Sequence, residues 1–252
     1  MKSENIVGKV FETNNYGKCT VIEYNSFKDV LVKFHNPEFL TKCRMNHLIA
    51  GNIKNLLAPL VYGKGYLGVG KYKPSNRIFY RAWNRVLERA YSKNWLIAHP
   101  CYAGTTVCDE WLNFQNFAEW CEGQKFFNAV DDKGKKYALD KDILVKGNKT
   151  YSPETCCFVP AELNSLLITA NRVRDILPIG VSFYKKTRKY KASGCFYGKA
   201  HHIGYYDTPE EAFLAYKKAK ESYIKEVAEK WKGRIEDKVY ETLKEYSVDI
   251  DD

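Results

Sequence analysis

The first seventy residues show short apolar runs separated by turn sequences. The runs are β-rich and only a few residues long, and turns are indicated at 14–17 and at Asn36-Pro37. The runs are Val7, Val10, 19–23, 30–34 and 41–44. We expect several short strands at this spacing to form a small β barrel of the SH3 type.

Between residues 78 and 123 the apolar spacing becomes that of a helix. Four apolar residues spaced three or four positions apart predict one face of a helix over 78–92. They are Tyr80, Trp83, Leu87 and Tyr91. Four aromatic residues spaced three apart follow, and we interpret them as core packing rather than as a platform for stacked bases. They are Trp111, Phe114, Phe117 and Trp120.

Residues 137–160 combine short apolar runs with strong turn signals. We expect a strand, a turn at Gly147-Asn148, a second short strand and then a helical turn. Ser152 suits an N-cap, Pro153 the first helical position and Glu154 the positive end of a helix. Residues 161–175 look helical, and Leu177-Pro178 marks the next boundary.

The clearest pattern lies between residues 178 and 232. Strands are predicted at 181–184, 190–196 and 202–206, joined by short basic or glycine-containing turns. A long helix then begins at Thr208, because Pro209 suits the first helical position and Glu211 completes a capping box. The stretch 233–252 predicts one more short helix and an acidic tail that we expect to fray.

Together these patterns predict a modular α+β protein with three domains. Residues 1–74 form the small β domain, residues 75–175 a central domain, and residues 176–252 a three-stranded sheet with one packed helix. No apolar run approaches the roughly 20 residues needed to cross a bilayer, and the N-terminus lacks the apolar stretch of a signal peptide. We therefore expect no membrane partner and a soluble protein of the cytoplasm. The oligomeric state is left open, with a monomer favoured.

Composition narrows the class of partner. The 252 residues include 40 Lys and Arg against 30 Asp and Glu, a formal net charge of +10. A hydrophobic content of 45% excludes a largely disordered chain. The positive charge favours a polyanion, because Lys and Arg release counterions when they meet phosphates. Composition alone does not separate DNA from RNA.

Two further motifs have an ordinary structural interpretation. The eight cysteines include no C-x-x-C pair, and we expect them to be reduced and mostly buried. A zinc site built from Cys101, Cys108 and Cys121 is the alternative. Four glycines between residues 63 and 70 match the dinucleotide-binding fingerprint, but a linker follows them instead of a helix. We therefore assign these glycines to turns.

Four arginines recur at every fourth position of the helix predicted near 78–92, with only Glu88 as a nearby acid. They are Arg77, Arg81, Arg85 and Arg89. Such a stripe is either a solvated helix face or a surface that follows the phosphates of DNA, and both interpretations stay open.

The predicted sheet at 178–206 carries many cations and no Asp or Glu. The cations are Lys185, Lys186, Arg188, Lys189, Lys191 and Lys199. Strand alternation points one set of side chains toward the helix and the other set outward. A sheet of this width can enter the major groove of DNA while its turns hold phosphates, so this face favours a nucleic-acid partner.

The same segment resembles the AP2 DNA-binding domain. The resemblance rests on Gly180-Val181, Tyr190-Lys191-Ala192, Ile203-Gly204 and Asp207-Thr208, followed by the helix pattern EEA…AY. In that family, arginines and a tryptophan on the exposed sheet face read base edges in the major groove. The matching positions here carry other polar or aromatic residues, with cations beside them. The DNA-binding residues that the resemblance implies are Ser182, Tyr184, Lys186, Arg188, Lys191, Ser193 and His202.

The centre of the chain resembles phage HNH homing-endonuclease-like proteins that carry AP2 modules. The matching stretches are YRAWNRVLERAY, VCDEWLNFQNFAEW and LDKDILVKGN with YSPETCCFVP, and the N-terminal GKVFETNNYG also fits. The resemblance implies a ββα-metal fold. It places Leu139-Asp140 at the paired histidines, Asn148 at the loop asparagine and Thr155 at the helical asparagine. No histidine lies between His99 and His201, so the general base usual in that family is missing.

A metal site without histidine is the prediction that follows for 137–160. Asp140 and Asp142, two apart on one predicted strand, would share a face and bind Mg²⁺ or Mn²⁺ with Glu154, while Asn148 orients the loop. The favoured function is a metal-dependent endonuclease or nickase acting on double-stranded DNA, with no organic cofactor. The alternative is a catalytically inactive DNA-binding regulator, in which the aspartates pair with nearby lysines. A third hypothesis is an RNA or protein interaction module on the N-terminal domain.

Overall fold

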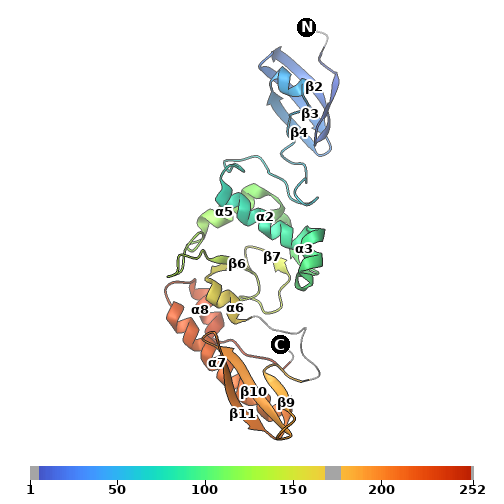
Figure 1. Ribbon diagram of the computed structural model, residues 1–252. Coiled ribbons are helices and arrows are strands. Elements are labelled where there is room, and N and C mark those ends of the chain that lie inside the picture. Colours follow the sequence, from blue (N-terminus) through green and yellow to red (C-terminus); the bar gives the residue numbers. More distant parts are fainter. Residues whose placement is uncertain (1–5, 168–176, 251–252) are drawn as a thin grey trace. The chain divides into compact units, whose positions relative to one another are not determined.

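The computed structural model describes residues 6–167 and 177–250. It is a mixed α+β structure of small sheets and helices (Figure 1). Packing divides the chain into two units, of which the first contains Met1–Gly123 and Lys149–Ser152 and the second Gln124–Asn148 and Pro153–Asp252. The boundary between the units falls inside the predicted central domain 75–175. Residues 138–140 pair with residues 157–159, and both strands belong to the second unit.

The N-terminal strands are those that the sequence predicts. β1 (Val10–Thr13), β2 (Gly17–Ser26), β3 (Asp29–His35) and β4 (Glu38–Cys43) form one antiparallel sheet in chain order. The short helix α1 (Met45–Ile49) adds two buried side chains to the sheet's core. The predicted barrel is wrong. Closure needs β1 to pair with β4, whereas these two strands are the edges of an open sheet.

The first unit also contains the predicted aromatic helices. The helix predicted over 78–92 is α2 (Arg77–Tyr91), and the aromatic stripe is divided between α4 (Asp109–Leu112) and α5 (Phe114–Gly123). Between them lie α3 (Lys93–Ala98), which was not predicted, and a 3-10 turn η2 (Pro100–Tyr102). β5 (Thr106–Val107) pairs in parallel with β7 (Thr150–Tyr151). Trp83 packs on Phe114 with ring centroids 5.4 Å apart and donates its indole N–H to the carbonyl of Trp111 at 2.7 Å. The aromatic stripe is therefore core, as predicted.

The glycines between 63 and 70 let a loop lie close to this aromatic core. A Cβ on Gly65 would come within 2.3 Å of Leu87, and one on Gly68 within 2.0 Å of Asn113. Gly68 also has a φ of 67°, which favours glycine. The turn interpretation holds, and close packing is the additional reason for these residues.

The second unit contains two small sheets. β6 (Ala138–Asp140) pairs antiparallel with β8 (Cys157–Val159), and α6 (Ala161–Leu166) follows. β9 (Val181–Tyr184), β10 (Lys189–Phe196) and β11 (Lys199–Tyr206) form an antiparallel sheet with β10 in the middle. α7 (Pro209–Trp231) and α8 (Asp237–Lys244) complete the unit. Part of the predicted helix over 161–175 lies outside the described residues.

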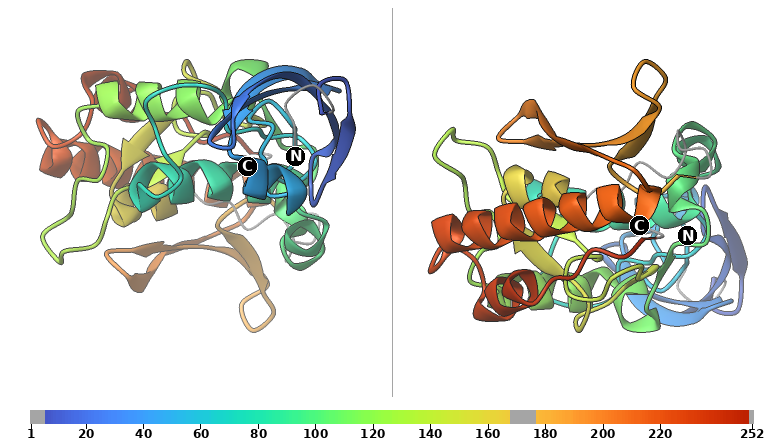
Figure 2. Two further views of the ribbon diagram at one scale, coloured as in Figure 1. Left: turned by 90° about the horizontal axis from the view of Figure 1, so that it is seen from above. Right: turned by 90° about the horizontal axis from the view of Figure 1, so that it is seen from below.

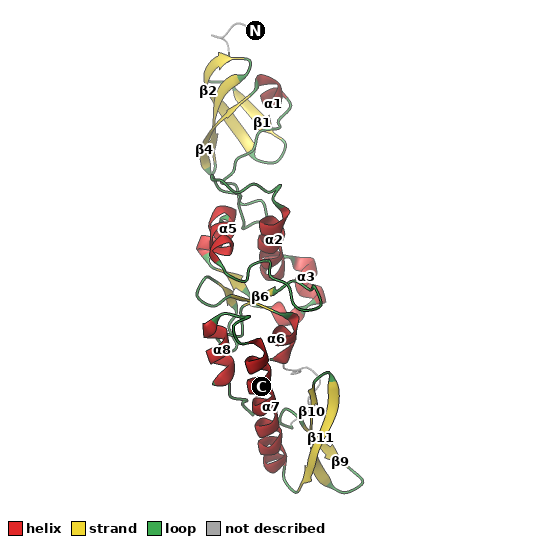
Figure 3. Ribbon diagram, turned by 90° about the vertical axis from the view of Figure 1, so that its left-hand side faces the viewer, coloured by secondary structure: helices red, strands yellow, loops and turns green. Residues whose placement is uncertain are grey.

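Helix α7 lies along one face of the β9–β10–β11 sheet (Figures 2 and 3). Ala192 at the centre of the sheet is fully buried against a cluster that includes Ala212 and Tyr216 of α7. The helix begins as predicted, because Thr208 and Glu211 form a complete capping box. The opposite face of the sheet is therefore left open.

The C-terminal segment packs against α7 instead of fraying at Asp249. Val248 is only 3% exposed and belongs to the core cluster beneath the sheet. Its N–H donates to Glu221 at 2.9 Å, and its carbonyl accepts from Lys217 at 2.5 Å. Asp249 pairs with Lys146 at 2.5 Å. Fraying was predicted for Asp249–Asp252, and it is wrong at Asp249, because this residue pairs with Lys146 directly after the buried Val248.

All eight cysteines lie in the described ranges, and none of them forms a disulfide. Those fully buried are Cys19, Cys121, Cys156 and Cys157, whereas Cys101 and Cys195 are exposed. Burial raises the pKa of the Cys157 thiol above its usual range. Across the described ranges, no helix is both long and apolar enough to span a bilayer.

Candidate nucleic-acid interface

Five of the seven DNA-binding residues that the AP2 resemblance implies lie on the open face of the β9–β10–β11 sheet. Cross-strand pairing places Ser182 opposite Lys191, and Lys191 opposite Tyr205. Ser193 pairs with His202 further along the same two strands. Directly paired side chains point to the same side of a sheet. Because the neighbouring Ala192 points into the core beneath α7, these residues point away from it.

An aromatic patch occupies the middle of this face. The ring centroids of Tyr184 and Tyr205 lie 5.2 Å apart, and those of His202 and Tyr205 lie 4.6 Å apart. Tyr205 is 41% exposed. Tyr205 was not predicted to bind DNA, because alternation along the strand from His202 would put it on the opposite face. A register shift between Ala192 and Ser193 brings His202 and Tyr205 to the same face.

The turn between β9 and β10 gathers exposed cations beside the patch. Lys185, Lys186 and Arg188 are exposed, and none of them makes an ion pair within the described part of the chain. Arg188 has a φ of 54° and closes the turn. Lys189 differs from them, because it is bound to Asp207 at 3.0 Å. The unneutralised charge is therefore concentrated at the tip of the turn.

The arginine stripe of α2 lies in the first unit and divides into two kinds of residue. Arg77, Arg81 and Arg85 are exposed and have no ion-pair partner among the residues that the structure describes. Arg89 is partly buried, lies over the ring of Tyr102 at 5.6 Å, and donates to the hydroxyl of Tyr151 at 3.4 Å. Each i to i+4 step rotates the side chain by about 40° around the helix. The fourth arginine therefore turns toward the protein, and only three remain for a phosphate surface.

The candidate metal site at 137–160 is built differently from its prediction. β6 ends at Asp140, and the chain then bends, so Asp140 and Asp142 do not share a strand face. Glu154 and Thr155 lie in a turn before β8, and the helix begins only at Ala161. The expected helical turn capped by Ser152 is therefore wrong, because this stretch instead leads into the strand that pairs with β6.

The side chains near Asp140 are occupied in closing a loop. One carboxylate oxygen of Asp140 accepts from the backbone N–H groups of Asp142 at 2.7 Å and Ile143 at 2.8 Å. Burial raises the pKa of Asp140, and these two N–H groups offset part of that rise. Lys141, only 6% exposed, pairs with Asp142 at 2.5 Å and donates to the carbonyl of Asn148 at 3.0 Å. The Asn148 amide returns a hydrogen bond to the carbonyl of Lys141 at 2.8 Å.

These contacts engage the two aspartates that the prediction assigns to Mg²⁺ or Mn²⁺. In residues 6–167 and 177–250 no three His, Cys, Asp or Glu side chains form a group that could hold a metal ion. The predicted set of Asp140, Asp142 and Glu154 is included in that statement, as is the alternative zinc set at Cys101, Cys108 and Cys121. We therefore derive no catalytic step through a metal.

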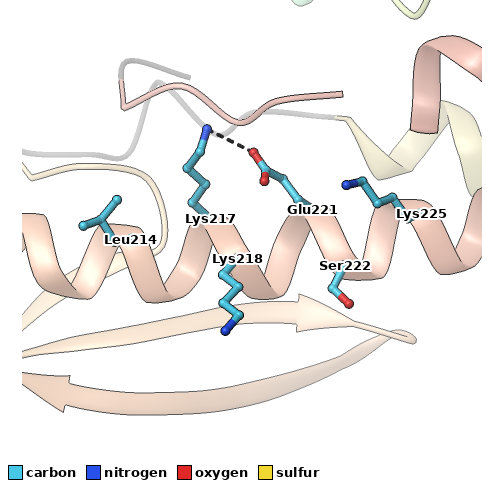
Figure 4. Close-up of a pocket in the computed structure, with 6 residues that line it drawn as sticks. All are labelled: Leu214, Lys217, Lys218, Glu221, Ser222 and Lys225. Carbon is cyan, nitrogen blue, oxygen red and sulfur yellow. Dashed lines mark ion pairs between the residues drawn. The ribbon is translucent and has the colours of Figure 1, made fainter. Parts of the chain in front are cut away.

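A shallow pocket lies along the surface of α7 (Figure 4). Its lining residues are Leu214, Lys217, Lys218, Glu221, Ser222 and Lys225. Lys217 is bound to Glu221 at 3.0 Å and to the C-terminal segment. Lys218 and Lys225 are exposed. This pair offers a charge-matched control for the cations of the β9–β10 turn.

Comparison with known proteins adds no relative to this description. No family model matches the chain, and no curated protein or solved structure matches it either. The function proposed below therefore rests on the chemistry and geometry of the residues.

Proposed function

We propose that this protein binds double-stranded DNA through the open face of the β9–β10–β11 sheet. One observation carries the proposal: a sheet face without Asp or Glu lies beside a turn whose three cations have no ion-pair partner in the described structure. Burying such a face against a surface without anionic groups would leave those charges without compensation. Phosphates compensate them and release counterions in doing so. The resemblance to the AP2 domain also supports DNA binding by this face.

The two parts of this surface have different tasks. Lys185, Lys186 and Arg188 extend from the turn and are suited to phosphate oxygens, which fix register but carry no sequence information. The side chains of the strands present hydroxyl, aromatic and amine groups toward the base edges, where sequence is read. The protein is therefore proposed to be a DNA-binding regulator with some sequence preference.

A charge-matched pair of variants tests this assignment. Lys186→Ala with Arg188→Ala should weaken DNA binding and reduce the salt dependence by about one unit of slope per lost phosphate contact. Fluorescence anisotropy with a labelled duplex at several salt concentrations measures both quantities. The control is Lys218→Ala with Lys225→Ala, two exposed lysines of α7 outside the β9–β10 turn. It removes the same charge and should leave the slope close to that of the wild type.

Equal losses in the two double variants would mean that net charge alone governs binding. Unchanged affinity in the turn variant, with an unaltered circular dichroism spectrum, would overturn the assignment of this face.

A metal-dependent nuclease is the second candidate. It is supported by the HNH resemblance of the sequence and by the paired strands β6 and β8 that precede α6. This helix begins at Ala161, after the positions that the resemblance assigns to it. Conversion of supercoiled plasmid to nicked circles, with Mg²⁺ or Mn²⁺ and then with chelator, tests it. Nicking that is lost in Asp140→Asn would establish the nuclease. Absence of nicking with either ion would leave the DNA-binding regulator.

A further inference from the structure

We propose that the aromatic patch of Tyr184, Tyr205 and His202 reads thymine methyl groups, so that A·T pairs are preferred at the centre of the bound site. This inference rests on the proposed DNA binding by the same face. It adds the base preference and the side chains that produce it.

The patch has the position that base readout requires. Tyr205 of β11 is directly paired with Lys191 of the central strand β10. Lys191 is in turn paired with Ser182 of β9. The ring of Tyr205 contacts Tyr184 on one side and His202 on the other. The phosphate-binding turn at 185–188 adjoins the strand end at Tyr184. A duplex whose backbone meets the turn would therefore bring base edges over these rings.

The charges on the face argue against readout of guanine. The most frequent specific contact to guanine is a bidentate arginine or lysine, yet the strands β9, β10 and β11 contain no arginine. Arg188 lies in the turn, and Lys189 is held by Asp207 at 3.0 Å. Lys191 is the remaining cation on the outward side of the three strands within the described chain. The centre of the face is therefore mainly aromatic and hydroxyl-bearing.

The chemistry of the rings matches thymine. In the major groove the thymine methyl group is the apolar feature that distinguishes the bases. An aromatic ring in contact with that methyl removes apolar surface from water, which is worth about a fourfold change in affinity per methyl group. The serine hydroxyls of the face are compatible with either base of a pair. The methyl group is thus the main source of discrimination expected here.

The experiment compares DNA with and without that methyl group. Selection from a random duplex library with the full chain first yields the preferred site. Each thymine in that site is then replaced by deoxyuridine, which keeps base pairing and removes only the methyl. We expect about a fourfold loss of affinity at one or two positions with the wild type. The same replacement should have no effect in Tyr205→Ala and should keep its effect in Tyr205→Phe.

The control is Leu214→Ala, which removes an exposed apolar side chain from α7, away from the sheet. It should leave the response to deoxyuridine unchanged. A selected site without thymine, or deoxyuridine that is neutral for the wild type, would overturn this inference. If either result is found while DNA affinity still depends on Lys186 and Arg188, the proposed DNA binding would remain supported.

Discussion

Among single residues, Asp140 illustrates how a side chain chosen for chemistry can have a structural task. Its carboxylate, and its spacing of two positions from Asp142 on one predicted strand, suggest a metal ligand. In the structure its carboxylate accepts hydrogen bonds from the backbone N–H groups of Asp142 and Ile143, directly after the end of β6. Buried N–H groups that lose an acceptor cost free energy. We therefore expect Asp140 to matter for stability whatever its part in catalysis.

Replacement of Asp140 separates these two roles. Asp140→Ala removes the acceptor and should lower the free energy of unfolding by about 1–3 kcal/mol. Asp140→Asn keeps an acceptor oxygen and avoids the cost of burying a charge, so its loss should be smaller. Urea unfolding followed by circular dichroism measures both. Equal stability of Asp140→Ala and the wild type would contradict the structural role.

Among the elements, α7 supports the sheet on one side and the C-terminal segment on another. Its first turn is closed by the capping box of Thr208 and Glu211. Thr208→Ala should cost about 1 kcal/mol of stability, because the N–H of Glu211 loses its acceptor. Ser222→Ala, at an exposed position of the same helix, should change stability by less than about 0.5 kcal/mol. Thermal or urea unfolding that ranks them in the reverse order would contradict this capping role.

The attachment of the C-terminal segment to α7 predicts a pH dependence. Burial of Glu221 acts to raise the pKa of its carboxyl group. The backbone N–H of Val248 and the side chains of Lys217 and Ser247 have a larger opposite effect, so the pKa of Glu221 is lowered. A carboxylate with a lowered pKa contributes stability at neutral pH that is lost as the pH falls through that pKa. The wild type should therefore lose more stability than Glu221→Gln between about pH 6 and pH 3.

Urea unfolding at several pH values checks this difference, and Lys225→Ala, which leaves the Glu221 contacts in place, is the control. Parallel pH profiles for the wild type and Glu221→Gln would show that the segment is not held by the Glu221 carboxylate.

At the scale of the whole molecule, positive charge is exposed in both units. The first unit presents Arg77, Arg81 and Arg85, and the second presents the β9–β10 turn. If α2 follows DNA phosphates, Arg81→Glu with Arg85→Glu should weaken binding to all duplex sequences alike and reduce the salt slope. Anisotropy titrations with the selected site and with a scrambled duplex measure both effects.

A loss confined to the selected site would instead indicate base contact by α2, and no loss would identify its arginines as a solvated face. Combining these changes with those at Lys186 and Arg188 should add the two slope reductions, because separate phosphate contacts contribute independently.

The sequence by itself determined the elements that depend on neighbouring residues. The strands β9 to β11, the start of α7 and the aromatic face of α2 follow from alternation, capping and helical spacing, which act over a few positions. The same alternation also grouped Ser182 with Tyr184, and Lys191 with Ser193, before their cross-strand partners were known. His202 was named from the AP2 resemblance alone. Such signals are local and can therefore be read along the chain.

Only the tertiary structure decided features that depend on contacts between distant residues. The open N-terminal sheet, the burial of Val248, the loop closed by Lys141 and Asn148, and the contact of Tyr184 with Tyr205 all join residues whose pairing no local pattern specifies. A side chain such as Asp140 can either bind a cation or accept hydrogen bonds from backbone N–H groups, and the sequence does not distinguish these two roles. The choice is made by which groups folding brings within hydrogen-bond distance.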